Sequence, residues 1–400
     1  MIANRHDIRL ELGLRPVINV SGTMTFLGAS IVVPEAIEAM ARMLPEFVEI
    51  ADLQRKACAV IARLTGAEAG TVTASTASGI SVAIAGCMTG ADLATIEQLP
   101  DVRGMKHEVV LQRGHMVNYG APVGQAVRLT GAFLRPIGDA TDARTYQLCA
   151  ALGDETAAAL YVASHHCVDY GQIPLEDFCA VCHERGVPVI VDAASEYDLT
   201  GFLAKGADIA IYSGHKFLGG PTTGIIAGRK DLVRAAYLQN FGIGRGMKVG
   251  KESIVGLIAT LEAWEKRDHA AVRAREDRHL ALWRERLSRR PGVRAEILPD
   301  PTGNPLDRLR VHIDPAAARV TAWDLATALG SGNPPVIVRD HHAENGFFDL
   351  DPCNLHDGEA EIVADQINAA LERGLAGQIP ATRLPDRRAG RFERMLAWPD

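Results

Sequence analysis

Short apolar segments alternate with segments of helical periodicity between residues 71 and 239. The apolar segments are nearly continuous, which is typical of parallel strands that are buried on both faces. Strand followed by helix, repeated along the chain, predicts an α/β domain whose mostly parallel sheet is covered by helices. The predicted strands are 71–74, 108–112, 158–163, 187–192, 207–212 and 223–227, and the predicted helices are 77–88, 175–186 and 229–239.

The periodicity is mainly helical on either side of this region. Residues 34–66 read as helical, and residues 251–290 read as one long or broken helix rich in Arg and Glu. A smaller α/β unit follows. Its predicted strands are 308–314 and 335–339, and its predicted helices are 322–330 and 357–376.

These patterns predict four parts. The first 30 residues are rich in turn formers and read as an arm, and the change of domain falls within the 251–290 helix. We expect the C-terminal tail, with its several Pro and Arg, to pack on a surface or on a partner subunit. The parts are an arm of 1–30, a large domain of 31–260, a small domain of 261–376 and a tail of 377–400.

Composition and charge exclude several classes of protein. The formal net charge of −7 disfavours a general nucleic-acid binder, which needs a basic surface to neutralise phosphates. No apolar segment is long enough to span a membrane, and the N-terminus lacks the features of a signal peptide. The seven cysteines are an odd number and fit reduced thiols in a cytoplasmic protein. Cys179 and Cys182 form a lone CxxC without a second pair, so no metal site is predicted.

Charged residues at the ends of two successive strands carry the strongest chemical signal. Asp192 ends the strand in VPVIVDAASE, and Lys216 follows the next strand in ADIAIYSGHKFLGGP. Ligands of open α/β sheets bind outside the carboxyl ends of the strands. A desolvated lysine can form a Schiff base with a carbonyl, and an aspartate beside it can keep a pyridinium nitrogen protonated. Each residue alone is better explained structurally, but together they predict pyridoxal 5'-phosphate (PLP) on Lys216.

The segment TASTASGISVAIAG follows a strand and opens a helix, which makes it an anion site. We assign the cofactor phosphate to this helix start, although an ordinary Ser/Thr cap explains the same residues. Ser213 and His215, just before Lys216, are predicted to add hydrogen bonds to the phosphate. The predicted residues of the helix start are Thr76, Ala77, Ser78 and Gly79.

His115 follows the predicted strand 108–112, where an imidazole can stack on the pyridine ring. A hydrogen-bonded loop histidine is equally compatible with this position. We group His115 with Lys216 and Asp192 as the predicted catalytic residues.

Basic residues in two places are candidates for binding the anionic parts of a substrate. Arg339 ends the strand in PPVIVRD, and its guanidinium fork suits a carboxylate, although an ion pair with Asp340 is the alternative. Arg245, Lys248 and Lys251 lie at a predicted helix N-terminus, where cations oppose the helix dipole and so favour a nearby anion. That anion belongs either to the substrate or to the cofactor of a neighbouring subunit.

The motifs SGHKFLGGP and VDAASE resemble those of fold-type I PLP enzymes. The segments IGRGMKVGKE and RPVINVSGTMT narrow the resemblance to the selenocysteine-synthase-like group, and within it to the D-glucosaminate-6-phosphate ammonia-lyase branch. The resemblance implies the fold-type I fold, with PLP on Lys216, Asp192 at the pyridine nitrogen and phosphate at 76–79. It also implies a homo-oligomer with active sites shared between subunits. Selenocysteine synthases carry a separate N-terminal tRNA-binding domain, for which no room is expected before RPVINVSGT.

The expected reaction is that of a PLP-dependent lyase. We expect elimination of water and ammonia from a small 2-amino-3-hydroxy acid, such as an amino sugar acid or its phosphate, to give a 2-keto acid. Lys216 would remove the Cα proton. An aminotransferase or an amino-acid racemase would use the same two residues, and the sequence does not separate them. A selenium transferase on seryl-tRNA is disfavoured by the missing domain, and a non-catalytic PLP-binding regulator by the presence of both Lys216 and Asp192.

Overall fold

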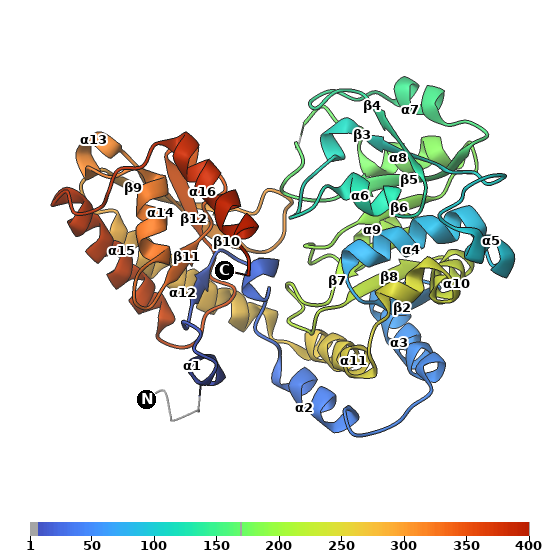
Figure 1. The fold of residues 1–400 in the computed structure, drawn as a ribbon, viewed down its shortest axis with the longest axis horizontal. Helices are drawn as coiled ribbons and strands as arrows, with labels where there is room; N and C mark the ends of the chain where they lie inside the picture. The colour runs from blue at the N-terminus through green and yellow to red at the C-terminus, as the bar shows by residue number, and fades with distance from the viewer. Residues whose placement is uncertain (1–6, 169, 400) are drawn as a thin grey trace. The chain divides into compact units, whose positions relative to one another are not determined.

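The computed structural model describes residues 7–168 and 170–399, which form two compact units. One unit comprises residues 30–267, and the other combines residues 7–29 with residues 268–399 (Figure 1). The arm therefore belongs to the same unit as the C-terminal residues. The reason is that β1 (Ile18–Val20) pairs in parallel with β11 (Val336–Val338) and buries Ile18 and Val20 in the C-terminal core.

A seven-stranded sheet forms the centre of the larger unit (Figure 1). The strand order is β2-β8-β7-β6-β5-β3-β4, and β8 alone runs antiparallel to its neighbours. All the other strands therefore point their carboxyl ends to one edge of the sheet. The strands are β2 (Ala69–Thr73), β3 (Glu108–Gln112), β4 (Phe133–Ile137), β5 (Thr156–Val162), β6 (Val189–Asp192), β7 (Ile209–Ser213) and β8 (Gly224–Gly228).

Helices cover both faces of this sheet, because successive strand residues point to opposite sides. In β6, Val189 and Val191 belong to one core, whereas Ile190 belongs to the other. The first core is covered by α3 (Ile50–Thr65), α8 (Leu175–His183) and α11 (Lys251–Lys266). The second core is covered by α4 (Thr76–Thr89), α6 (Val123–Arg128) and α10 (Lys230–Leu238).

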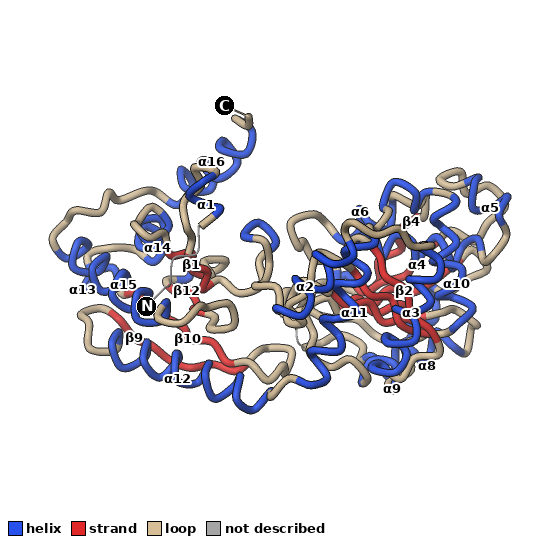
Figure 2. Tube along the Cα trace, turned by 90° about the horizontal axis from the view of Figure 1, so that it is seen from below, coloured by secondary structure: helices blue, strands red, loops and turns tan. Residues whose placement is uncertain are grey.

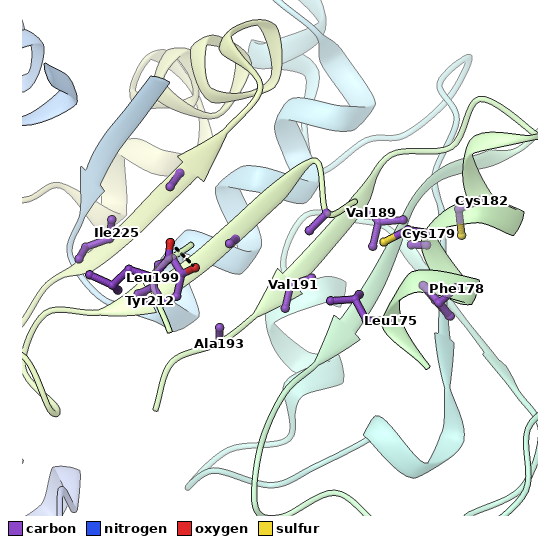
Figure 3. Close-up of a cluster of buried hydrophobic side chains, with 14 of the residues drawn as sticks. Leu175, Phe178, Cys179, Cys182, Val189, Val191, Ala193, Leu199, Tyr212 and Ile225 are labelled. Atoms are coloured by element: carbon purple, nitrogen blue, oxygen red, sulfur yellow. Dashed lines mark hydrogen bonds between the residues drawn. The ribbon is translucent and has the colours of Figure 1, made fainter. Parts of the chain in front are cut away.

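The CxxC cysteines lie in the first of these cores. Figure 3 shows Cys179 and Cys182 of α8 among Leu175, Phe178 and Val189. Both thiols are free and buried, and burial raises their pKa values to about 12. They act as small apolar side chains of the core.

The second unit is built around antiparallel strands in the order β12-β10-β9 (Figure 2). Leu309, Val311 and Ile313 of β10 face the core together with Phe348 and Leu350 of β12. The helices packed in this unit are α12 (His269–Leu287), α14 (Ala322–Gly330) and α15 (Glu359–Leu375), and the remaining strands are β9 (Val293–Pro299), β10 (Asp307–Ile313) and β12 (Phe347–Leu350).

Short elements complete the described chain. No helix in this part of the chain is long and apolar enough to cross a membrane. The remaining α-helices are α1 (Ile8–Glu11), α2 (Pro34–Met43), α5 (Leu93–Gln98), α7 (Thr145–Ala151), α9 (Gly201–Ala204), α13 (Pro315–Ala318) and α16 (Leu384–Leu396). The 3-10 helices are η1 (Thr25–Leu27), η2 (Arg113–His115), η3 (Gln239–Phe241), η4 (Ile243–Met247) and η5 (Ala343–Asn345).

Two predicted helices are divided in the structure. The helical segment 34–66 separates into α2 and α3 around Pro45, because proline has no N–H to continue the helical hydrogen bonds. The segment 251–290 separates into α11 and α12, and Asp268 caps the second helix by accepting the Ala271 N–H. The boundary between the two compact units falls at the same point, between residues 267 and 268, within the predicted segment 251–290.

Candidate active site

The predicted site residues of the larger unit follow strands whose carboxyl ends share one edge of the sheet. Asp192 ends β6, Lys216 follows β7, His115 follows β3, and Thr76 opens α4 directly after β2. β6 and β7 are hydrogen-bonded neighbours, so Asp192 and the start of the Lys216 turn are adjacent. The topology thus brings residues from distant parts of the sequence to one edge.

Asp192 is a buried carboxyl group that accepts a hydrogen bond from a nearby backbone N–H. Its side chain is only 6 % exposed, and its Oδ1 accepts the Ala194 N–H at 3.2 Å. Burial raises the pKa of Asp192 to about 6, and the positive charge of Lys216 counteracts this rise. A protonated ring nitrogen held by this carboxylate would relieve the cost of burying its charge.

The side chain and the backbone of Lys216 each form a hydrogen bond with a serine hydroxyl group. Its Nζ donates to Ser195 Oγ at 2.6 Å, and its backbone oxygen accepts from Ser30 Oγ at 2.6 Å. Ser195 was not predicted as a site residue. The available signal was its position in VDAASE, on the loop that leaves β6 beside the Lys216 strand.

The start of α4, where the anion site is predicted, uses part of its polar residues to cap the helix. Ser75 and Ser78 form a capping box, in which each hydroxyl accepts the other residue's backbone N–H, at 3.1 and 2.9 Å. Gly79 N–H donates to Ser75 O, and Gly79 allows α4 to lie close to Ile211, which a Cβ would approach to 3.0 Å. Ser78 and Gly79 therefore shape the helix start, whereas the N–H groups of Thr76 and Ala77 occupy first-turn positions without intrahelical acceptors.

His215 provides an independent test of the fit for a phosphate. Its Nδ1 lies 3.2 Å from Ser213 Oγ, and its Nε2 is buried with no hydrogen-bond partner among the described residues. Burial and then Lys216 lower the pKa of His215, while the Thr223 backbone opposes them. In the tautomer in which the Ser213 hydroxyl donates to Nδ1, the neutral ring carries its proton on Nε2. A buried N–H donor without an acceptor fits an anionic ligand beside Lys216.

His115 lies beside the carboxyl end of β5 as a neutral, oriented ring. It is 3 % exposed, and its Nδ1 accepts the N–H of Val162, the residue that pairs in register with Asp192. Its ring meets Tyr161 edge to face at 4.4 Å. Burial lowers the pKa of His115 to about 4, so it carries no proton charge near neutral pH. Its stacking on the cofactor remains a prediction.

The predicted substrate residues belong to other elements of the chain. Arg339 belongs to the second unit, where its Nη1 donates to Ser21 O at 3.3 Å. The neighbouring Asp340 forms an ion pair with Arg387 of α16. Arg245 lies in η4, which packs against α4, and Lys248 directly follows η4; both side chains are exposed.

Residues 17–290 match the family described as SelA: L-seryl-tRNA selenium transferase. The chain belongs to this family. It is 40% identical over 366 residues to the D-glucosaminate-6-phosphate ammonia lyase of Salmonella typhimurium, covering 92% of this chain and 98% of that protein. The solved structure of a D-glucosaminate-6-phosphate ammonia-lyase superposes with a TM-score of 0.84 and 39% identity, covering 94% of this chain and all of that one.

A second relative of this chain has a different activity. The 5'-C-glycyluridine monooxygenase-decarboxylase of a Streptomyces species is 35% identical over 91% of this chain and 92% of that protein. The more similar relative is the ammonia lyase. The comparisons confirm the predicted fold-type I α/β fold, the PLP cofactor and a carbon–nitrogen lyase, which they favour over the aminotransferase, racemase and selenium transferase alternatives.

Proposed function

We propose that this chain removes ammonia from a 2-amino-3-hydroxy sugar acid, and that D-glucosaminate 6-phosphate is the first substrate to test. The proposal depends mainly on the amine of Lys216 and the buried carboxyl of Asp192, which follow adjacent strands. Its support from comparison is the 40% identity to a lyase named for that substrate. The overall change would be loss of ammonia to give a 2-keto-3-deoxy acid.

We assign the proton transfer at Cα to Lys216. PLP bound at this lysine supplies an electron sink for the charge that develops at Cα. In this role Lys216 Nζ would act as a base that Ser195 Oγ holds in place. The C–H bond at Cα and the C–O bond at Cβ then break, and water leaves. The released enamine takes up a proton at Cβ and hydrolyses, which returns the water and frees ammonia.

Asp192 and His115 would hold and shape the ring end of the site. The carboxylate of Asp192 keeps the ring nitrogen protonated, and the cost of its burial favours this pairing. His115, fixed by the Val162 N–H and neutral near pH 7, presents a flat ring rather than a charge.

The phosphate would be held by donors at the start of α4 and by the histidine that precedes Lys216. They are the N–H groups of Thr76 and Ala77 at the start of α4, and the Nε2–H of His215. Ser213 orients His215 through their 3.2 Å contact. A helix N-terminus and a buried imidazole donor both favour an anion.

Arg339 is our candidate for the substrate carboxylate, and Arg245 and Lys248 are our candidates for a phosphate. Lys251, close to Arg245 in sequence, lies 5.5 Å from the ring of Phe47. Phe47 is one of several exposed apolar side chains in the segment that contains α2 and runs to the first residue of α3, and we call this set the α2–α3 patch. The patch consists of Ile31, Ile37, Leu44, Phe47, Val48 and Ile50.

We infer a homo-oligomer that covers the α2–α3 patch. Phe47 is fully exposed in the single chain, and large clustered apolar side chains mark protein interfaces. Arg245 and Lys248 would then lie beside the interface, where they can serve the site of a neighbouring subunit.

All seven cysteines are free thiols, which supports a reducing, cytoplasmic compartment.

The test is ammonia release by the purified holoenzyme from D-glucosaminate 6-phosphate, without an added keto acid. We expect equimolar ammonia and 2-keto acid, both in air and under nitrogen. Lys216→Ala should lower the rate at least about 10³-fold and abolish the Schiff-base absorption band. A product that appears only with oxygen, together with CO2, would instead match the monooxygenase-decarboxylase relative. No absorption band after addition of PLP would refute the assignment of Lys216.

A further inference from the structure

The sheet of the second unit carries charged residues on one face. Leu309 and Val311 of β10 point into the core, so Arg308 and Arg310, which alternate with them, lie on the opposite face. Arg310 is paired in register with Asp349 of β12. Arg339, the candidate carboxylate ligand, pairs with the other side of β12.

Asp349 lies between two arginines. Arg310 Nε and Nη2 donate to Asp349 Oδ1 and Oδ2 at 2.8 and 3.3 Å. On its other side, Asp349 exchanges backbone hydrogen bonds with Arg339 in both directions, each at 3.0 Å. Directly opposed residues of an antiparallel pair project to the same face. The side chains of Arg310, Asp349 and Arg339 therefore form one row across three strands.

The surrounding contacts hold Arg310 in this row. Its guanidinium lies 4.0 Å from the centre of the Phe347 ring, which restricts its orientation. On the same face, Arg308 divides its donors between two carboxylates, with Nε donating to Asp351 Oδ2 at 2.8 Å and Nη1 to Asp300 Oδ2 at 2.6 Å. Burial and Arg308 lower the pKa of Arg339, whereas Asp351 and Asp349 raise it, so these charges act on Arg339 at close range.

We propose that Arg310 is a positioning residue for substrate binding. By binding both carboxylate oxygens of Asp349, Arg310 limits the competition between Asp349 and the substrate carboxylate for Arg339. This inference rests on the proposed function, in which Arg339 binds that carboxylate. Removing the charge of Arg310 would strengthen the hold of Asp349 on Arg339 and weaken the binding of an anionic substrate.

The test is a charge-removal series in the holoenzyme, with D-glucosaminate 6-phosphate as substrate. Arg310→Met keeps contact with Phe347 but releases Asp349, and we expect KM to rise about 10-fold with kcat changed less than about twofold. Adding Asp349→Asn removes the competing charge, so the double variant should return KM close to the wild-type value. A merely structural role of Arg310 would produce neither the separation of KM from kcat nor this rescue.

A matched control is available on the other side of the same unit. Arg286 of α12 forms an ion pair of the same kind with Asp365 at 2.8 Å, and Arg286→Met should leave KM unchanged. If Arg310→Met does not fold, Arg310→Lys carries the test, with an expected rise in KM of about threefold because the two-point contact is lost.

Two results separate the inference from the proposed function. An unchanged KM in Arg310→Met, combined with a raised KM in Arg339→Met, would overturn the role of Arg310 and leave the proposed function intact. An unchanged KM in Arg339→Met itself would remove Arg339 from the proposed site.

Discussion

Lys216 Nζ donates a hydrogen bond to Ser195 Oγ at 2.6 Å, and this bond joins the turn after β7 to the loop after β6. Asp192 is the last residue of β6 and directly precedes this loop. The end of β6 and the loop after it therefore supply both the carboxyl group assigned to the ring nitrogen and the hydroxyl group that orients the reactive amine. Ser195 is the neighbour through which the position of Lys216 can be tested without removing the lysine.

Ser195→Ala should lower kcat about 10-fold while PLP still binds. A hydrogen bond to a charged amine contributes about 1.5–3 kcal/mol, and about 1.4 kcal/mol corresponds to a tenfold change in rate. The measurement is steady-state ammonia release, with the absorption band confirming cofactor loading. Ser195→Thr keeps the hydroxyl group and should retain most of the activity. Equal losses in both variants would show that packing, not the hydroxyl group, matters at this position.

The raised pKa of Asp192 predicts that the stability of the apoprotein depends on pH. Its folded pKa of about 6 lies above its ordinary value of 3.8, so the folded state binds more protons than the unfolded state between these values. Stability should therefore fall as pH rises through this range, by up to about 3 kcal/mol at pH 8. Asp192→Asn keeps an oxygen for the Ala194 N–H and removes the buried charge, so it should be the more stable apoprotein at pH 8.

Urea unfolding of both apoproteins at pH 5 and pH 8 measures this difference. The advantage of Asp192→Asn should shrink at pH 5, where the wild-type carboxyl group is largely protonated. A difference that is the same at both pH values would mean that the carboxyl group is not strained by burial. The variant should also be inactive as a holoenzyme, because its amide cannot neutralise a protonated ring nitrogen.

The central strands could be predicted from sequence because both of their faces are buried. The predicted strand 108–112 has the same bounds as β3, and the other predicted strands of the sheet overlap observed ones. β4 was not predicted, because Phe133–Ile137 contains Pro136 and has only one fully buried residue, as an edge strand allows. The pairing of β1 with β11 was also missed, because a parallel contact between residues about 300 apart leaves no local pattern.

The candidate site was predictable only where a residue's position on a strand end determined its role. Asp192 and Lys216 were assigned in this way, and their roles stay predictions. Ser78 has the right residue type and position for a phosphate ligand, but its hydroxyl group is used by Ser75. The competition between Ser75 and a phosphate for this hydroxyl group depends on the geometry of the first helix turn, which the sequence does not show. The unpartnered Nε2 of His215 likewise depends on burial that the sequence does not display.

His215→Ala should weaken PLP binding about 10-fold. The substitution removes the buried Nε2–H that we assign to the phosphate, and a hydrogen bond to a charged group contributes about 1.5–3 kcal/mol. The measurement is titration of the apoprotein with PLP, followed by absorbance. His183→Ala is the matched control, because His183 forms its ion pair with Asp208, which directly precedes β7 at the opposite end of that strand. An unchanged affinity in His215→Ala would remove this residue from the phosphate site.

Phe47→Ser tests whether the α2–α3 patch is a subunit interface. Phe47 exposes its whole side chain in the single chain, and burying a phenylalanine contributes about 1.5–3 kcal/mol per subunit. We expect the variant to dissociate at protein concentrations about 10-fold or more above those at which the wild type does, as measured by light scattering after size exclusion. Leu129→Ser is the control, because Leu129 is also exposed but lies outside the patch. Activity should fall with dissociation if Arg245 and Lys248 serve a neighbouring subunit. Dissociation with full activity would place both residues in the service of their own chain, and an unchanged mass would show that the interface lies elsewhere.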